Sequence, residues 1–90
     1  MKIIMYTKKG CPWCDGVRDL LNDKKVVFEE REVRFNPQHF KELIDISKQE
    51  LTPTLIIDGK DILADSDKEQ VAEYLKEKGV RGFLKFNFIL

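Results

Sequence analysis

Residues 2–14 read Lys-Ile-Ile-Met-Tyr-Thr-Lys-Lys-Gly-Cys-Pro-Trp-Cys, and this stretch decides the fold. Residues 2–7 form a nearly continuous apolar, β-prone run, which is typical of a strand buried on both faces. Two lysines and a glycine break the run, and from Cys11 to about Asn22 apolar residues recur at helical spacing. Pro12 suits the first helical turn, where a backbone N–H has no helical partner. We therefore predict a central strand, a loop and a helix that begins at the cysteine pair.

The rest of the chain alternates strand and helix patterns. It predicts a strand over residues 26–34, a helix over 37–48 capped by Asn36, strands over 53–57 and 60–63 joined at Asp58-Gly59, and a helix that begins at a Ser66/Glu69 capping box and stops at Gly79. The order β-α-β-α-β-β-α indicates an α/β fold. Its four-stranded mixed sheet should be parallel at the start and antiparallel in the late hairpin.

Composition limits the class of protein. Ninety residues allow one domain, and 42% hydrophobic with 36% charged residues exclude a disordered segment. Sixteen basic residues balance sixteen acidic ones, which disfavours binding to nucleic acid or an anionic membrane. The run Ile3–Tyr6 is too short for a signal-peptide core, and two cysteines three residues apart favour a reducing compartment. We expect a cytoplasmic monomer.

Cys11 and Cys14 have the spacing that thiol-disulfide exchange needs. One thiolate attacks a disulfide sulfur, and a nearby second thiol then displaces the mixed disulfide. At a helix amino terminus, unpaired backbone N–H groups and the macrodipole stabilise a thiolate. We predict Cys11 as the nucleophile and Cys14 as the resolving thiol, with weaker help from Lys8 and Lys9.

Two other interpretations of the cysteine pair are zinc binding and inert core packing. A zinc site takes three or four protein ligands, and beyond the pair this chain offers only His39, so zinc would need a second chain. Two inert cysteines would need neither a proline between them nor a strand-to-helix junction. Redox activity without a metal is the favoured interpretation.

Together these features resemble the glutaredoxin branch of the thioredoxin-like proteins over residues 1–79. The resemblance rests on the strand before the loop, on Lys8 three positions before Cys11, on the Cys-Pro-aromatic-Cys motif and on Thr52-Pro53 before a later strand. Trp13 stands where glutaredoxins usually have tyrosine. The resemblance implies a thioredoxin-like fold and a dithiol-disulfide oxidoreductase that holds no permanent cofactor and uses glutathione as cosubstrate.

The resemblance also implies a set of residues that contact a glutathione-like substrate. They are Lys8, Pro12, Trp13, Thr52, Pro53, Ser66 and Asp67. Pro53 is expected to be a cis-proline with the Thr52 backbone facing the bound thiol, Lys8 to bind the glycyl carboxylate, and Ser66 and Asp67 to bind the γ-glutamyl end. Two features depart from the family pattern: Ala64-Asp65 replaces a glycine pair, and Glu50 stands near a common arginine position.

The residues leave the reductant open. The favoured function is reduction of protein or glutathione mixed disulfides, with glutathione or thioredoxin reductase returning the electrons. One alternative is a redoxin that donates electrons to ribonucleotide reductase and is reduced by thioredoxin reductase. A less favoured alternative is a dimeric iron-sulfur-binding module, because two available thiols favour the intramolecular disulfide over cluster ligation.

Two segments have no assigned function in this interpretation. Residues 29–34 carry a run of charges that reads as a solvated strand edge, which discourages association between sheets. Residues 80–90 form an apolar extension that we expect to fold back over the domain, with burial in a partner as the alternative.

Overall fold

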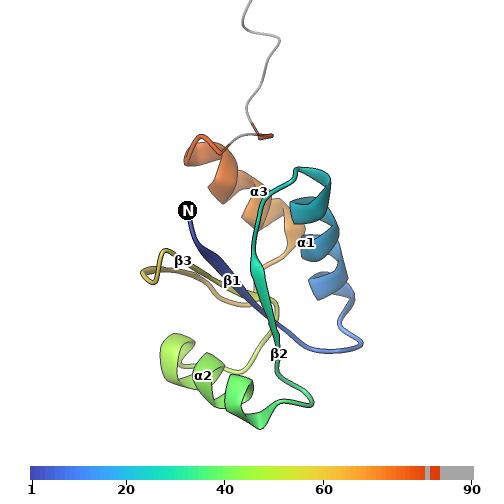
Figure 1. The fold of residues 1–90 in the computed structure, drawn as a ribbon, viewed down its shortest axis with the longest axis vertical. Coiled ribbons are helices and arrows are strands. Elements are labelled where there is room, and N and C mark those ends of the chain that lie inside the picture. The colour runs from blue at the N-terminus through green and yellow to red at the C-terminus, as the bar shows by residue number, and fades with distance from the viewer. Residues whose placement is uncertain (81, 84–90) are drawn as a thin grey trace, which may run out of the picture.

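The computed structural model describes residues 1–80, 82 and 83 (Figure 1). The elements are β1 (Ile3–Thr7), α1 (Pro12–Asp23), β2 (Glu29–Glu32), α2 (Pro37–Ser47), β3 (Thr54–Ile57), β4 (Asp61–Leu63) and α3 (Lys68–Glu77). The predicted order β-α-β-α-β-β-α is therefore confirmed. The Asp58-Gly59 turn is also confirmed, since both residues have a positive φ and the Lys60 N–H donates to the Ile57 carbonyl at 3.0 Å.

The four strands form one mixed sheet in the order β2-β1-β3-β4. β1 pairs in parallel with β2 and antiparallel with β3, and β4 adds to β3 as an antiparallel hairpin. The predicted α/β class with a mixed sheet is confirmed. β1 lies inside the sheet and runs antiparallel to β3. The loop that follows β1 therefore lies at the same end of the sheet as Thr52, which comes just before β3.

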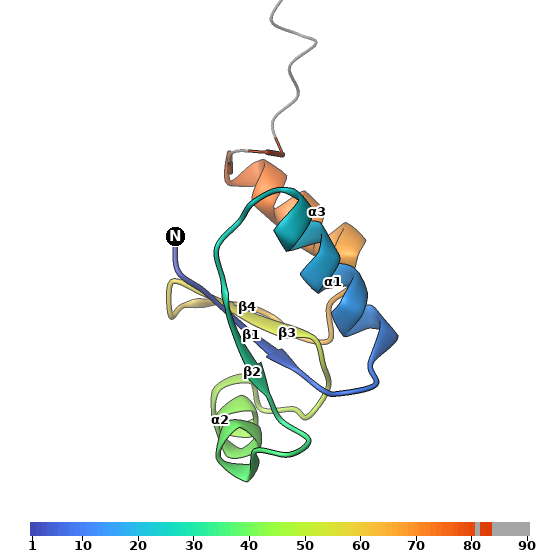
Figure 2. The same ribbon diagram turned by 45° about the vertical axis from the view of Figure 1, so that its right-hand side comes forward.

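Side chains of β1 alternate between two apolar clusters, one on each face of the sheet. Ile3 and Met5 join a cluster with α1 and α3, to which Leu21 and Leu75 contribute. Tyr6 joins the opposite cluster, which includes Leu43 of α2. Figure 2 shows α1 and α3 next to one another on one side of the sheet and α2 on the other. This two-sided burial explains why β1 reads as a continuous apolar run.

β2 is shorter than the predicted strand over residues 26–34. The first residues of that run close α1 instead: Lys25 adopts a left-handed φ of 57°, and the Val26 N–H donates to the Leu21 carbonyl at 2.9 Å. Val26 and Phe28 then pack against the core from a connecting segment, while Val27 is 85% exposed. The strand predicted for residues 26–28 was therefore wrong, and strand structure is confined to Glu29–Glu32.

The predicted cap of α2 is correct in position, whereas the predicted capping box of α3 is wrong. At α3 the capping residue is Asp67, whose carboxylate accepts from the Gln70 N–H at 2.8 Å. Ser66 is buried, and its hydroxyl donates to the Pro53 carbonyl at 3.0 Å, so it cannot form the capping box with Glu69. At α2, Asn36 holds the capping position without a side-chain capping bond.

The structure tests only the start of the apolar extension. Val80 and Phe83 pack against the cluster between the sheet, α1 and α3. Residues 84–90 lie outside the described residues, so the predicted boundary at residue 79 and the fold-back of the tail stay predictions. Among the residues that the structure describes, no helix is long and apolar enough to cross a membrane.

Candidate active site

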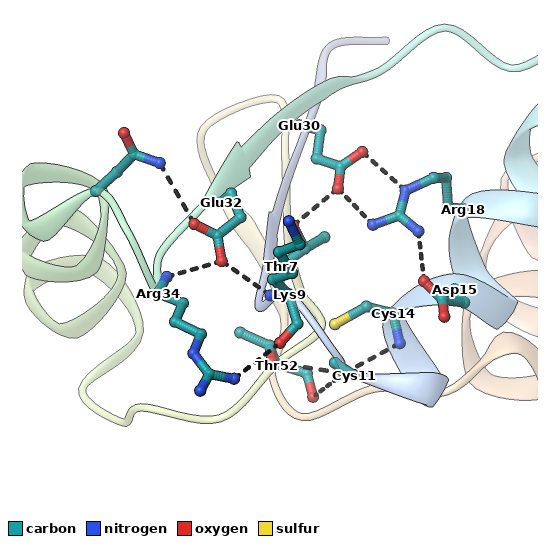
Figure 3. A network of polar contacts seen from close by, with 11 residues as sticks. Thr7, Lys9, Cys11, Cys14, Asp15, Arg18, Glu30, Glu32, Arg34 and Thr52 are labelled. Atoms are coloured by element: carbon teal, nitrogen blue, oxygen red, sulfur yellow. Dashed lines mark hydrogen bonds and ion pairs between the residues drawn. The ribbon is translucent and has the colours of Figure 1, made fainter.

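A tight turn after β1 delivers Cys11 to the start of α1. The Cys11 N–H donates to the Lys8 carbonyl at 3.1 Å, and Gly10 takes a φ of 85°, which residues with a side chain rarely adopt. Cys11 is the N-cap of α1, and its Sγ accepts from the Cys14 N–H at 3.2 Å (Figure 3). The Cys11 sulfur thus sits where an unpaired helix amide can stabilise negative charge.

Thr52 lies opposite Cys11 at the entrance to β3. Its hydroxyl donates to the Cys11 Sγ at 3.7 Å, and the Cys11 thiol donates to the Thr52 carbonyl at 3.8 Å. The Thr52–Pro53 peptide bond is cis, as the family resemblance implies. The Thr52-Pro53 segment therefore contacts the cysteine motif, although Thr52 and Cys11 are 41 positions apart in the sequence.

Cys14 differs from Cys11 in its surroundings. Both are free thiols, but Cys14 is buried while Cys11 is half-buried. Desolvation and the hydrogen bond with Cys11 raise the pKa of Cys14 to about 11. At neutral pH Cys14 therefore keeps its proton, which fits a thiol that acts second.

This asymmetry gives a prediction for chemical labelling. A single addition of iodoacetamide to the reduced native protein at neutral pH should alkylate Cys11 and leave Cys14 unmodified, because only thiolates react and Cys14 is both protonated and buried. Peptide mass spectrometry reports the modified residue, and unfolded protein, in which both cysteines should react, is the control. Equal labelling of both cysteines in the folded protein would contradict this assignment.

A hollow of about 420 Å³ opens beside Cys11. Five of the predicted residues line it, namely Lys8, Cys11, Pro12, Trp13 and Thr52. Its remaining walls include Lys9, Arg34, Glu50, Leu51 and Asp65. The hollow is therefore large enough for part of a peptide-sized disulfide, and both cations and carboxylates border it.

A second hollow, of about 340 Å³, shares Pro12 and Trp13 with the first and reaches the start of α3 at Asp67. Trp13 is 64% exposed between the two. Pro53 and Ser66 line neither hollow, and both are buried. Ser66, a predicted contact residue, thus lies beneath the site, where its hydroxyl donates to the Pro53 carbonyl.

Arg34 and Leu51 are lining residues that the sequence analysis missed. Arg34 comes from the segment after β2 and also borders a neighbouring hollow with Lys8 and Glu50. It belongs to the charge run that was interpreted as a solvated edge, and no local pattern separates it from the other charges. Leu51 is 56% exposed, and its position directly before the Thr52-Pro53 motif was the available signal.

The charge run proves to be more than a solvated edge. β2 is an edge strand, as predicted, but its carboxylates bind other parts of the molecule. Glu30 accepts from the Arg18 guanidinium of α1 at 2.9 Å and from the Thr7 hydroxyl at 2.8 Å. Glu32 reaches the loop that precedes Cys11 (Figure 3). In the described part of the chain, no cluster of three or more metal-ligating side chains is found.

Comparisons with known proteins agree with this geometry. A family model described as Glutaredoxin matches residues 3–62. Glutaredoxin 1 of Rickettsia felis is 38% identical over 82 residues, which cover 83% of this chain and 80% of that protein. Glutaredoxin 3 of Escherichia coli K12 is 34% identical over 58 residues, covering 64% of this chain and 70% of that protein. The crystal structure of the glutaredoxin from Methanosarcina mazei Go1 matches with a TM-score of 0.64 at 26% identity, covering 82% of this chain and 77% of that one.

Proposed function

Because the chain belongs to the glutaredoxin family, whose members are dithiol-disulfide oxidoreductases, we propose that Cys11 and Cys14 carry out its exchange reaction with glutathione as the returning reductant. The observation that carries the proposal is the position of the Cys11 sulfur, which accepts a helix amide at the mouth of an open hollow. The chain is an enzyme of the thiol-disulfide oxidoreductase class; the proposal concerns its residues and its reductant.

The proposed reaction has two exchanges. The Cys11 thiolate attacks one sulfur of the substrate disulfide, forms a mixed disulfide and releases the other sulfur as a thiolate, which takes a proton. Cys14 then loses its proton and attacks the Cys11 Sγ. This step forms the Cys11–Cys14 disulfide and releases the second substrate thiol. Two electrons pass from the cysteine pair to the substrate, and two glutathione molecules, oxidised to glutathione disulfide, restore the dithiol.

Several features support glutathione as the reductant. Lys8 borders the Cys11 hollow, where its ammonium group suits a carboxylate. Asp67 borders the second hollow at the start of α3, where its carboxylate suits an ammonium group. Pro12 and Trp13 connect the two hollows. A glutathione molecule joined to Cys11 would have its two charged ends near groups of opposite sign.

One observation favours the alternative, a redoxin reduced by thioredoxin reductase that supplies electrons to ribonucleotide reductase. Glu50 and Asp65 also border the Cys11 hollow, and Glu50 shares the neighbouring hollow with Lys8 and Arg34. These carboxylates oppose binding of a substrate carboxylate near the lysine. Glutathione would then bind weakly, and a partner protein could reduce the disulfide instead.

The two reductants can be separated directly. We expect the oxidised protein to be reduced by glutathione coupled to glutathione reductase and NADPH, and more slowly by thioredoxin reductase. Replacing Lys8 by methionine should raise the KM for glutathione about threefold to tenfold, the effect of losing one exposed ion pair in a partly desolvated site. The rate of NADPH consumption measures reduction by glutathione and reduction by thioredoxin reductase.

Lys60→Met is the matched control, because Lys60 is exposed in the turn after β3, at the opposite end of that strand from Thr52. Its KM for glutathione should equal that of the unmodified protein. Reduction by thioredoxin reductase alone, with none by glutathione, would exclude the glutathione proposal and leave the redoxin alternative.

A further inference from the structure

The end of β2 and the segment that follows it together hold both backbone polar groups of Lys9. The Glu32 carboxylate accepts from the Lys9 N–H at 2.8 Å, and the Arg34 guanidinium donates to the Lys9 carbonyl at 3.4 Å. Arg34 also lies against the next residue, since a Cβ built on Gly10 would be 3.9 Å from the Arg34 Nη1. Lys9 is two residues before Cys11, so these contacts fix the loop that carries the thiol (Figure 3).

Glu32 makes an unusual set of contacts for a residue in a charge run. Its oxygens accept from three backbone N–H groups, those of Lys9 at 2.8 Å and of Arg34 and Phe35 at 2.9 Å. Desolvation raises the pKa of Glu32, but the hydrogen bonds from the Phe35, Lys9 and Arg34 N–H groups outweigh it, so the pKa lies below the usual range. The carboxylate therefore remains an ionised acceptor at neutral pH and joins two loops.

The loop held in this way sets the position of the Cys11 sulfur. Gly10 has a positive φ and follows Lys9 directly, and the Cys11 N–H closes the turn on the Lys8 carbonyl at 3.1 Å. The Cys11 sulfur must then stay within reach of the Cys14 N–H at 3.2 Å and of the Thr52 hydroxyl at 3.7 Å. A shift of Lys9 would move the sulfur away from these donors.

We propose that Glu32 is a positioning residue for the Cys11 thiolate, which it acts upon through the Lys9 backbone, with Arg34 as the second contact. The proposal rests on the proposed function, in which Cys11 is the attacking sulfur. Exchange needs the thiolate aligned with the substrate disulfide, and misplacement by about 1 Å can cost as much as 100-fold in rate. Two residues of an apparently solvated charge run thereby support the reaction.

Replacement of Glu32 by glutamine tests this proposal, because one carboxylate oxygen becomes an N–H donor that faces backbone N–H groups. We expect Glu32→Gln to slow disulfide exchange about tenfold and to shift the pH profile of Cys11 alkylation to higher pH, since the sulfur loses its helix amide. The direction of the shift is decisive. Loss of a negative charge acting only through space would instead favour the thiolate and shift the profile to lower pH.

Glu29→Gln is the matched control, because Glu29 lies on the same strand and its carboxylate pairs with Arg31 at 2.7 Å instead of reaching the loop. Its exchange rate and alkylation profile should match the unmodified protein. An unchanged or lower-pH profile in folded Glu32→Gln would overturn the proposal. If circular dichroism shows that Glu32→Gln is unfolded, Glu32→Asp, whose shorter side chain keeps the charge, is judged by the same criteria.

The same measurements separate this proposal from the proposed function. If the unmodified protein exchanges disulfides through Cys11 while Glu32→Gln equals it in rate and pH profile, only the positioning role fails. If Cys11 of the unmodified protein does not exchange at all, the proposed function itself fails.

Discussion

Replacement of Cys11 by serine is expected to abolish disulfide exchange, with a loss in kcat/KM on the order of 1,000-fold or more. A hydroxyl neither ionises near neutral pH nor forms a disulfide, so no mixed disulfide can arise. The fold should persist, because the Ser oxygen can replace the sulfur as acceptor of the helix amide from Cys14. Reduction of a glutathionylated peptide measures the activity, and thermal unfolding verifies the fold.

Cys14→Ser is the matched variant, since it removes the other sulfur of the same motif. It should keep measurable activity toward glutathionylated substrates, because external glutathione can resolve the mixed disulfide on Cys11. It should lose activity toward protein disulfides that require the second thiol. Equal loss in both variants on the glutathionylated substrate would contradict the assigned order of attack.

Replacement of Leu55 by alanine is expected to lower the free energy of unfolding by about 3 kcal/mol, within the range found for buried leucines. Leu55 is fully buried in β3 and pairs across the sheet with Met5 and Leu63. Truncation would leave a cavity in the cluster that joins the sheet to α1 and α3. For a domain of this size the loss is a large part of total stability.

Leu51→Ala is the control for this change, because it removes the same atoms from a side chain that is 56% exposed. Its free energy of unfolding should change by less than about 0.5 kcal/mol. Urea unfolding followed by circular dichroism gives both values. A loss below about 1 kcal/mol in Leu55→Ala would show that the cluster tolerates the cavity and does not depend on this residue.

Where local sequence determines structure, the prediction succeeded. β1 could be recognised because residues buried on both faces must all be apolar, and α1 because Pro12 and the spacing of Val17 and Leu21 favour a helix. The Asp58-Gly59 turn could be predicted because these two residue types tolerate a positive φ, which both adopt in the structure. The family resemblance added the pairing of Cys11 with the distant Thr52-Pro53 segment, which no local pattern provides.

Where contacts between distant residues determine the local structure, the prediction failed. Ser66 and Asp67 are both good capping residues, and the choice depends on the Pro53 carbonyl, which takes the Ser66 hydroxyl. Val26 and Phe28 look like strand residues because a core-facing connection has the same apolar character as a strand.

From the sequence, Glu32 and Arg34 are indistinguishable from solvated charges. Only the structure shows that both bind the Lys9 backbone. Apart from Leu51, the missed part of the candidate site lies in these long-range contacts. Their sequence signal is limited to the period-two spacing of Glu30 and Glu32, which puts both carboxylates on one face of β2.

The most direct test of the central claim is to trap the mixed disulfide. Cys14→Ser, reduced and then mixed with glutathione disulfide, should accumulate one glutathionyl group per chain, and peptide mapping should place it on Cys11. Cys11→Ser treated in the same way should remain unmodified, because the remaining thiol at Cys14 is buried and this desolvation raises the pKa of Cys14. An adduct on Cys14 in the Cys11→Ser protein, or none on Cys11 in the Cys14→Ser protein, would contradict the assignment of Cys11 as the attacking thiolate.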